Sequence, residues 1–287
     1  MGTRFEIVLP DVRGNPSGPA LRAAGEAAID EILIWHQRLN RFAPDSLVSH
    51  LGRSSHAVPL DRETFELFAD ALEVWRASAG AFDITVTPAL VRLGAADSAV
   101  PVRDSPRGSE RIRLDPARRT IQLCGSQVSL DLGGIAKGHA IDCAAARLRT
   151  AGVSAALVHG GTSSVLALGR PSLHTAWRVA LGPTRGEPVA LENMALSLSD
   201  PSGQMHLTGR IHIVDPRTGP QPAGAPVFAA SAPGSTVVVV GPSARRADAW
   251  STALAVLGRV PGSFPRGYDA CFLPHRHIEP VHAHATV

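Results

Sequence analysis

Apolar residues recur every three or four positions in two stretches of the N-terminal third of the chain. In residues 20–39 charged side chains separate the apolar ones, which predicts an amphipathic helix. A second helix is predicted over 62–78, because Asp61 is a suitable N-cap and Gly80 suits the turn that follows a helix.

Alternating apolar and polar positions predict short β-strands in much of the remaining chain. We expect a strand within the first residues, 1–14, and a hairpin over 111–132 that turns at Asp115. Shorter strands are expected within 176–182 and 209–219. These patterns give no internal repeat of fixed length.

Two segments combine a strand, a turn and a helix. In the first, a strand over 128–132 leads through a glycine turn into a helix over 136–152, and 153–161 returns as a strand. In the second, a run of valines is followed by Ser243, a suitable N-cap, and by a helix that ends at Gly258. Together with the hairpins, these units predict a mixed helix and sheet fold.

Composition sets the size and the class of the protein. The chain has 287 residues and 44% hydrophobic content, enough for one large domain or two closely packed lobes. Proline, serine and charged residues over 95–111 predict an exposed excursion, and the histidine-rich 275–287 predicts an exposed tail. Cys124, Cys143 and Cys271 match no metal or redox spacing, so we expect reduced packing residues.

Charge and hydropathy exclude several classes of partner. The formal charge of +3 is spread along the chain and aromatic residues are only 5%, which disfavours nucleic acid binding. No apolar run of 18 residues predicts a membrane span. The first residues lack the pattern of a signal peptide, so we expect a cytoplasmic protein, with export possible if translation starts upstream.

The glycine turn of the first unit carries the only lysine of the chain. The other 27 basic residues are arginines, so Lys137 occupies a position where an arginine was not used. Gly133 and Gly134 permit close backbone approach, and the helix that follows directs free N–H groups toward the turn. The turn therefore suits a phosphate, with Asp131 placed to bind a hydroxyl or amine nearby, although a plain tight turn gives the same pattern.

The helix of the second unit carries three oxygen donors. Asp248, Ser251 and Thr252 share one face of the helix, at the edge of its apolar stripe. Such a set suits a hard cation such as Mg²⁺ together with a substrate phosphate. An ordinary solvated helix face is the alternative interpretation.

Three further residue types qualify for a role at the same site. His212 lies on a predicted strand, where a lone histidine is more often structural; in a cleft it would be a candidate general base near neutral pH. Phe42 and Phe82 are candidates for covering a flat aromatic ligand whose edge Asp83 would bind, although each aromatic residue taken singly is typical of a core.

Six stretches occur along the chain in this order: MGTRFE, RFAPDSLVSHL, GAFDITVTPALVRLG, LDLGGIAKGHAID, HIVDPRTG and ADAWSTALAVLG. Together they resemble the ApbE family, the FAD:protein FMN transferases, over nearly the whole chain. The resemblance implies a single α+β domain over 1–287, a two-lobed mixed αβ fold with the ligand cleft between the lobes.

The resemblance also implies a site for FAD and Mg²⁺. The flavin- or adenosine-contacting positions would be Met1, Phe42, Ala81, Phe82, Asp83, Asp131, Lys137 and Val214. The metal would be held by the Gly134 carbonyl, Asp248 and Thr252, with Ser251 beside them. Catalysis would depend on Lys137 and Asp248, and His212 would deprotonate the acceptor.

An enzyme of this kind transfers FMN from FAD to a threonine of an acceptor flavoprotein and releases AMP. Two alternatives stay open, an FAD pyrophosphatase that yields FMN and AMP, and a protein that binds FAD without turnover. They stay open because HGGTSSV replaces the family's Asn-x-Gly-Gly-Asp; ALSLSD in place of Ala-Thr-Ser-Gly is a second departure on the acceptor side. The sequence leaves the oligomeric state and the choice between Mg²⁺ and Mn²⁺ undecided.

Overall fold

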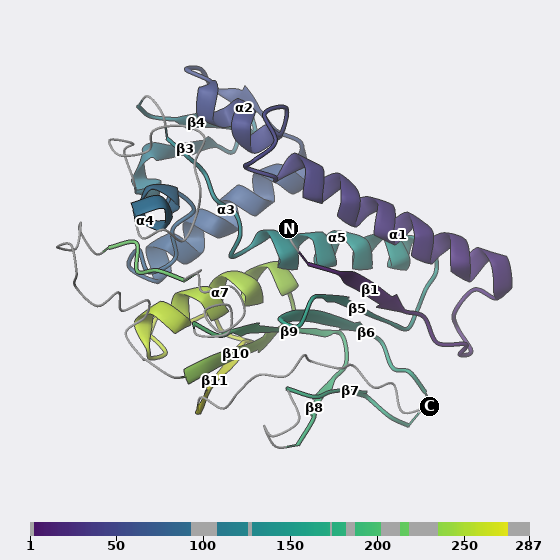
Figure 1. Cartoon of the computed structure of the whole chain (residues 1–287). Coiled ribbons are helices and arrows are strands. Elements are labelled where there is room, and N and C mark those ends of the chain that lie inside the picture. Colours follow the sequence, from purple (N-terminus) through teal and green to yellow (C-terminus); the bar gives the residue numbers. More distant parts are fainter. Residues whose placement is uncertain are drawn as a thin grey trace.

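A computed structural model describes residues 3–92, 108–125, 128–172, 174–181, 187–201, 213–217 and 235–274. Its elements in chain order are β1 (Phe5–Val8), α1 (Gly18–Arg38), α2 (Leu47–Arg53), β2 (Val58–Pro59), α3 (Arg62–Ala77), α4 (Thr87–Arg92), a 3-10 helix (Ser109–Arg111), β3 (Ile112–Asp115), β4 (Thr120–Leu123), α5 (Ala136–Thr150), β5 (Ala156–Gly160), β6 (Ser164–Leu168), β7 (Trp177–Val179), β8 (Val189–Leu191), β9 (Met194–Ser199), β10 (Ser235–Gly241), α7 (Ala244–Leu257) and β11 (Asp269–Pro274). Figure 1 shows their arrangement.

A six-stranded antiparallel sheet forms the base of the molecule, in the order β1-β5-β6-β9-β10-β11. Helices α5 and α7 lie on one face of this sheet, and α1 packs on α5 (Figure 1). The hairpin β7–β8 lies on the other face. A smaller sheet, β2-β4-β3, accompanies α2 and α3 on the helix side.

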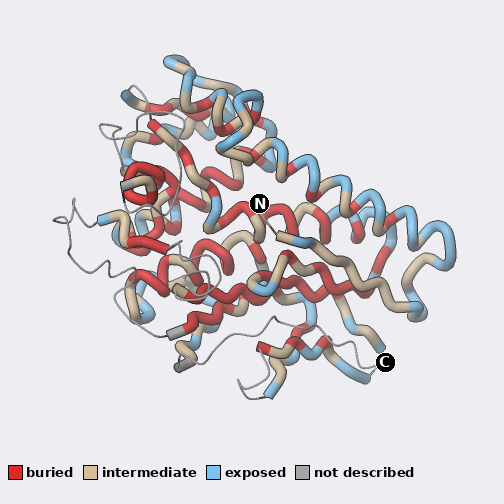
Figure 2. The backbone as a smooth tube through the Cα atoms, in the orientation of Figure 1, coloured by how far each residue is buried: buried red, intermediate tan, exposed pale blue. Residues whose placement is uncertain are grey.

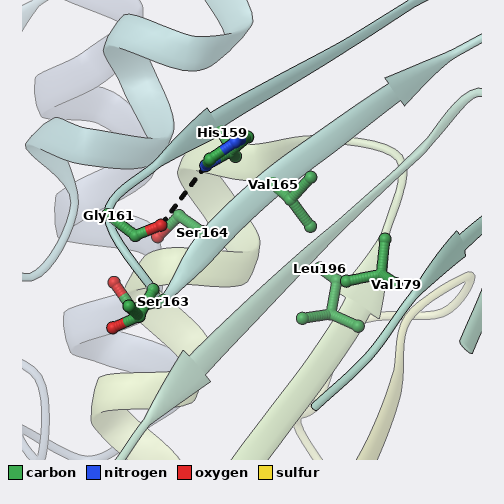
Figure 3. A pocket seen from close by; sticks show the side chains of 8 residues that line it. His159, Gly161, Ser163, Ser164, Val165, Val179 and Leu196 are labelled. Atoms are coloured by element: carbon green, nitrogen blue, oxygen red, sulfur yellow. Dashed lines mark hydrogen bonds between the residues drawn. The ribbon is translucent and has the colours of Figure 1, made fainter. Parts of the chain in front are cut away.

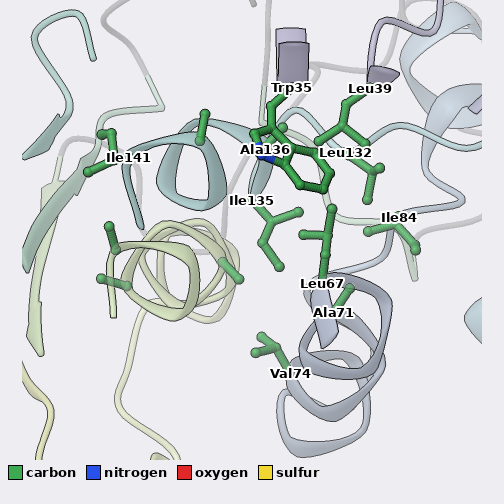
Figure 4. Close-up of a cluster of buried hydrophobic side chains, with 14 of the residues drawn as sticks. Trp35, Leu39, Leu67, Ala71, Val74, Ile84, Leu132, Ile135, Ala136 and Ile141 are labelled. Atoms are coloured by element: carbon green, nitrogen blue, oxygen red, sulfur yellow. The ribbon is translucent and has the colours of Figure 1, made fainter. Parts of the chain in front are cut away.

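The core is continuous through the helix layer and down to the sheet. Trp35 of α1, Leu67 of α3 and Ile135 at the start of α5 converge between the helices (Figure 4), and each is at most 2% exposed. Buried segments in Figure 2 follow α5, α7 and the central strands. A separate apolar cluster joins Trp177 of the β7–β8 hairpin to Leu196 of β9. The central strands are therefore covered by the helices on one face and by the β7–β8 hairpin on the other.

Most elements predicted from the pattern are present. The first strand, the two N-terminal helices and the hairpin turning at Asp115 are confirmed. Asp61 caps α3 by accepting a hydrogen bond from the Thr64 N–H at 2.8 Å. Ser243 caps α7, which ends at Gly258 in the left-handed conformation, φ 66°. Local capping chemistry thus fixed these helix ends.

The strand predicted over 128–132 is wrong. Leu130 and Leu132 are buried as the alternation implied, but the segment has no strand partner. Its Asp131 N–H instead donates to the Ile84 carbonyl at 2.7 Å, so it crosses between layers. Of the strand predicted over 209–219, the described residues 213–217 form a turn and no strand.

Helices α5 and α7 pack backbone against backbone at Gly138. A Cβ atom added to Gly138 would lie 2.1 Å from the Ala244 carbonyl oxygen. Only glycine allows this contact between two backbones. The close approach sets the distance between the N-terminal turns of the two helices, which carry Lys137 and Asp248.

We expect Gly138→Ala to destabilise the protein, because the new methyl group forces α5 and α7 apart. The expected loss is about 1–3 kcal/mol of unfolding free energy, the range for overpacked sites. Gly262→Ala is the matched control, since a Cβ there meets nothing within 4 Å. Urea denaturation of both variants measures the difference, and equal stability of the two would contradict the packing argument.

In the part of the chain that the structure describes, no helix combines the length and the apolar character that a bilayer crossing requires.

Candidate functional site

Lys137 and Asp248, which lie far apart in the sequence, meet at one point in the fold. The Lys137 Nζ lies 3.3 Å from Asp248 Oδ1 and 3.5 Å from the Gly133 carbonyl oxygen. The Lys137 side chain is 22% exposed and that of Asp248 is 3% exposed. The glycine turn before α5 and the oxygen-bearing face of α7 therefore share one site, with the amine accessible and the carboxylate buried.

Asp248 is buried but well supplied with donors. Its Oδ2 accepts a hydrogen bond from the Gly138 N–H at 3.1 Å, and the Ser197 Oγ lies 3.3 Å from Oδ1. A buried carboxylate without such partners would be costly. The solvated helix face considered as an alternative is therefore wrong for Asp248.

A chain of serines continues below Asp248. Ser251 is fully buried, and its Oγ lies 2.8 Å from the Ser199 Oγ and 3.2 Å from the Ser197 Oγ. It also donates to the Asp248 carbonyl at 3.0 Å. Ser251 thus faces the sheet, and its hydroxyl supports the helix that carries Asp248.

Gly134, Phe82 and Thr252 lie together beside this corner. A Cβ atom on Gly134 would lie 3.1 Å from the Thr252 Oγ1 and 3.2 Å from Phe82 Cε2. Thr252 Oγ1 donates to the Asp248 carbonyl at 3.2 Å, and Phe82 is 4% exposed. The glycine turn thus fits against the oxygen-bearing edge of α7.

The donor set is compatible with a hard cation. Asp248 Oδ1 has only long contacts, both at 3.3 Å, and the Thr252 hydroxyl and the Gly134 backbone lie close by. Among the described residues no three His, Cys, Asp or Glu side chains gather as a metal site. A cation here would therefore depend on one carboxylate, neutral oxygens and substrate phosphate, as Mg²⁺ commonly does.

Asp83 organises the loop that carries Phe82. Its Oδ1 accepts hydrogen bonds from the Thr85 N–H, the Thr85 hydroxyl and the Ser109 hydroxyl, all at 2.7 Å. Ser109 is 1% exposed, so this residue of the predicted exposed excursion is buried against the loop, whereas Glu110 is exposed. Residues 93–107 lie outside the described part, as does the predicted tail.

Phe42 is the most exposed large hydrophobic residue of the site. Its side chain is 70% exposed, and the Arg41 guanidinium carbon lies 4.3 Å from its ring centroid. Arg41 also pairs with Asp131 at 3.2 Å, while Asp131 Oδ1 accepts a hydrogen bond from the Gly133 N–H. Arg41 is not among the residues predicted from the sequence, although its position beside Phe42 is a signal for cation–π stacking.

The segment 213–217 joins the loop at Gly80. Val214 is buried with Ala89 of α4, and Arg217 Cγ would lie 3.6 Å from a Cβ on Gly80. Burial raises the pKa of Asp215, but hydrogen bonds from Arg217 outweigh this effect and hold its pKa below the ordinary value. Met1 and His212 lie outside the described residues, so their roles stay predictions.

Two buried groups behind the site do not titrate near neutral pH. Burial lowers the pKa of His139 to about 3 and raises the pKa of Cys143 to about 12. The His139 ring packs edge-on against Trp35 with 4.1 Å between centroids. Both residues therefore act as packing groups, which leaves acid–base chemistry to other side chains.

The end of β5 and the start of β6 carry polar side chains on both faces of the sheet. His159 lies 3.0 Å from Glu6 and lines a small pocket with Ser163 and Val165 on the face that carries the β7–β8 hairpin (Figure 3). Ser164 is buried, and within the described residues its Oγ has no hydrogen-bond partner. Because Ser164 is paired with Ser197 in register, this hydroxyl faces the helix layer that carries Asp248.

Comparisons with known proteins agree with this geometry. The sequence profile of the ApbE family matches residues 1–263. The chain belongs to the ApbE family. Its relatives include the FAD:protein FMN transferases of Chlamydia pneumoniae, 29% identical and covering 75% of this chain and 70% of that protein, and of Klebsiella pneumoniae, 26% identical and covering 90% and 77%.

Solved ApbE structures have the same fold. The apo flavinyl transferase ApbE of Pseudomonas stutzeri superposes with a TM-score of 0.68 at 22% identity and covers 94% of both chains. The flavin transferase ApbE of Vibrio cholerae gives a TM-score of 0.68 at 22% identity, with 90% and 84% covered. The mixed αβ fold predicted from the motifs is confirmed, and by family and fold the chain is an ApbE-type transferase.

Proposed function

We propose that this protein transfers FMN from FAD to a threonine hydroxyl of an acceptor flavoprotein, with Mg²⁺ as the cation, and releases AMP. The observation that carries the proposal is the meeting of Lys137, Asp248, Gly134 and Thr252 at one corner. An ammonium group and oxygen donors on two sides of one position suit a diphosphate. The Chlamydia and Klebsiella relatives are named FAD:protein FMN transferases, which supports the transfer of FMN from FAD.

Asp248, the Thr252 hydroxyl and the Gly134 carbonyl would hold Mg²⁺. A cation bound there would neutralise charge on the diphosphate oxygens of FAD. Ser251 was predicted as a further ligand, but its Oγ is engaged with Ser199, and we propose that it supports Asp248 instead. The Lys137 ammonium would bind the phosphoryl oxygens on the exposed side.

The transfer forms one P–O bond and breaks another. The acceptor threonine Oγ attacks the FMN phosphorus, and the bond to the AMP oxygen breaks. His212 would take the hydroxyl proton, since an ordinary histidine pKa suits neutral pH. The Lys137 ammonium would stabilise the charge on the transferred phosphoryl group and on AMP.

The remaining sequence candidates would bind FAD. We assign the flavin to Phe42, whose ring is exposed. Ala81 and Phe82, in the buried loop after α3, would complete the flavin site. Asp131 would bind a hydroxyl or amine of the nucleotide, and Asp83 would keep the loop in shape. Met1 and Val214 complete the set that the family resemblance implied.

Incubation of the purified chain with FAD and Mg²⁺, with and without an acceptor that carries a flavinylation threonine, tests the function. Covalent flavin on the acceptor and an equal amount of AMP are expected only when the acceptor is present. Release of AMP without acceptor would indicate a pyrophosphatase, and intact bound FAD would indicate a binding protein. An acceptor with valine in place of the threonine is the matched control.

We expect Phe42→Ala to weaken FAD binding about tenfold, because aromatic stacking on a base contributes about 1–3 kcal/mol. Stability should hardly change, since the ring is 70% exposed. Leu33→Ala is the control, an exposed apolar residue of α1. Titration of flavin fluorescence gives the affinities, and unchanged binding by Phe42→Ala would exclude Phe42 from the flavin site.

A further inference from the structure

The N-terminal halves of α5 and α7 exchange carboxylates, each from the second turn of its helix. Asp248 of α7 accepts the Gly138 N–H of α5 at 3.1 Å. In return, Asp142 of α5 accepts the Ala244 N–H at 2.9 Å and the Arg245 N–H at 3.0 Å at the start of α7. Each helix thus supplies the carboxylate that binds the free N–H groups of the other.

Helical spacing makes this exchange possible. Gly138 and Asp142 are four residues apart on α5, and Ala244 and Asp248 are four apart on α7, so each pair lies on one helix face. Gly138 and Ala244 touch at the centre. The first turns of the two helices therefore overlap, with one carboxylate on either side of the contact.

Electrostatics explains why two carboxylates are needed. The N-terminus of a helix carries about half a positive charge, and here two such ends meet beside the Lys137 ammonium. The N-cap of α5, Ile135, makes no side-chain capping bond, so Asp248 is the side chain that satisfies this end. Asp142 also accepts the Ser243 hydroxyl at 2.8 Å.

We infer that Asp142 is a positioning residue, which holds the N-terminus of α7 against α5 and thereby sets the distance between Lys137 and Asp248. Asp142 touches no reacting group itself. Burial raises the pKa of Asp142, and its hydrogen bonds oppose the rise. Burial disfavours the charged form of Asp142, so we explain this carboxylate by its bonds to the start of α7, which fix the position of that helix.

The single lysine of the chain allows a direct test of this geometry. Reductive methylation with ¹³C-formaldehyde labels Lys137 and the N-terminal amine, so NMR shows one lysine signal. In the wild-type protein we expect this signal to be displaced from that of a dimethyl-lysine peptide. Asp142→Asn should move it at least halfway back, because Asp248 leaves the amine.

Asp61→Asn is the matched control. Like Asp142, Asp61 accepts an N–H at a helix N-terminus, and it pairs with Arg38 away from the site. It should leave the lysine signal at the wild-type position. Ser243→Ala, which removes one donor to Asp142, should move the signal in the same direction by a smaller amount. This variant decides the matter if Asp142→Asn shows no cooperative thermal unfolding.

An unmoved lysine signal in the folded Asp142→Asn variant, or in Ser243→Ala if the former does not fold, would overturn the inference. The catalytic consequence rests on the proposed function. In Asp142→Asn, kcat should fall about tenfold, whereas KM for FAD should stay within about threefold because Phe42 is unaffected. The NMR measurement needs neither FAD nor an acceptor. It therefore decides the role of Asp142 even if the chain transfers no FMN.

Discussion

Lys137→Ala should lower the rate of FMN transfer at least about a hundredfold at saturating FAD and Mg²⁺. The amine is the accessible partner of the Lys137–Asp248 pair, placed to stabilise charge that grows on the phosphoryl oxygens and on AMP. Removal of one preorganised charge stabiliser commonly costs about 2.7–4 kcal/mol of transition-state stabilisation. Initial rates of AMP release and of flavin incorporation measure the effect.

Two further variants test whether charge or position matters at Lys137. Arg147→Ala removes another ion-paired cation of α5, bonded to Glu31 at 3.3 Å, and should retain nearly the wild-type rate. Lys137→Arg keeps the charge but places a longer, planar group beside the Gly133 carbonyl, and should lose at least about tenfold. Near-normal turnover of Lys137→Ala would remove Lys137 from the mechanism.

Asp248→Asn should lower the rate by a similar factor, at least about a hundredfold. The substitution removes the only carboxylate of the proposed cation site and the partner of Lys137. Because the side chain is buried, the change should also lower the free energy of unfolding by about 1–3 kcal/mol. Transfer rates and urea denaturation on the same samples separate the two effects.

The control for Asp248→Asn is again Asp61→Asn, an ion-paired carboxylate at a helix N-terminus away from the site. It should lose little stability, because asparagine also caps a helix and the ion pair is half-exposed, and it should keep its rate. Raising the Mg²⁺ concentration should partly restore Asp248→Asn, because the remaining oxygen donors still bind the ion weakly. A wild-type rate and a wild-type Mg²⁺ dependence would together show that Asp248 holds no catalytic cation.

Local sequence patterns predicted most helices, because capping and amphipathic spacing act within a few residues. Asp61 and Ser243 fixed the starts of α3 and α7 in this way. The strand predicted over 128–132 failed for the opposite reason. Its alternation is real, but whether an extended segment pairs with a neighbour depends on where the chain has placed that neighbour.

Some residues of the candidate site were predictable from the sequence and others were not. Lys137, Asp248 and Thr252 were visible because their residue types are unusual at their positions. Arg41 and Ser197 were not, since an arginine among 27 and a serine in a strand are unremarkable. Their roles follow from partners that lie 50 to 90 residues away.

The sequence by itself determined several helix ends, the family motifs and the residue types of the proposed phosphate and cation site. Only the tertiary structure decided that the α5 and α7 N-termini overlap, that Ser251 faces the sheet, and that Asp142 completes the exchange of carboxylates. The physical reason is range: propensity and capping act over one helical turn, whereas a buried carboxylate is satisfied by whichever donors the packing of distant segments brings to it.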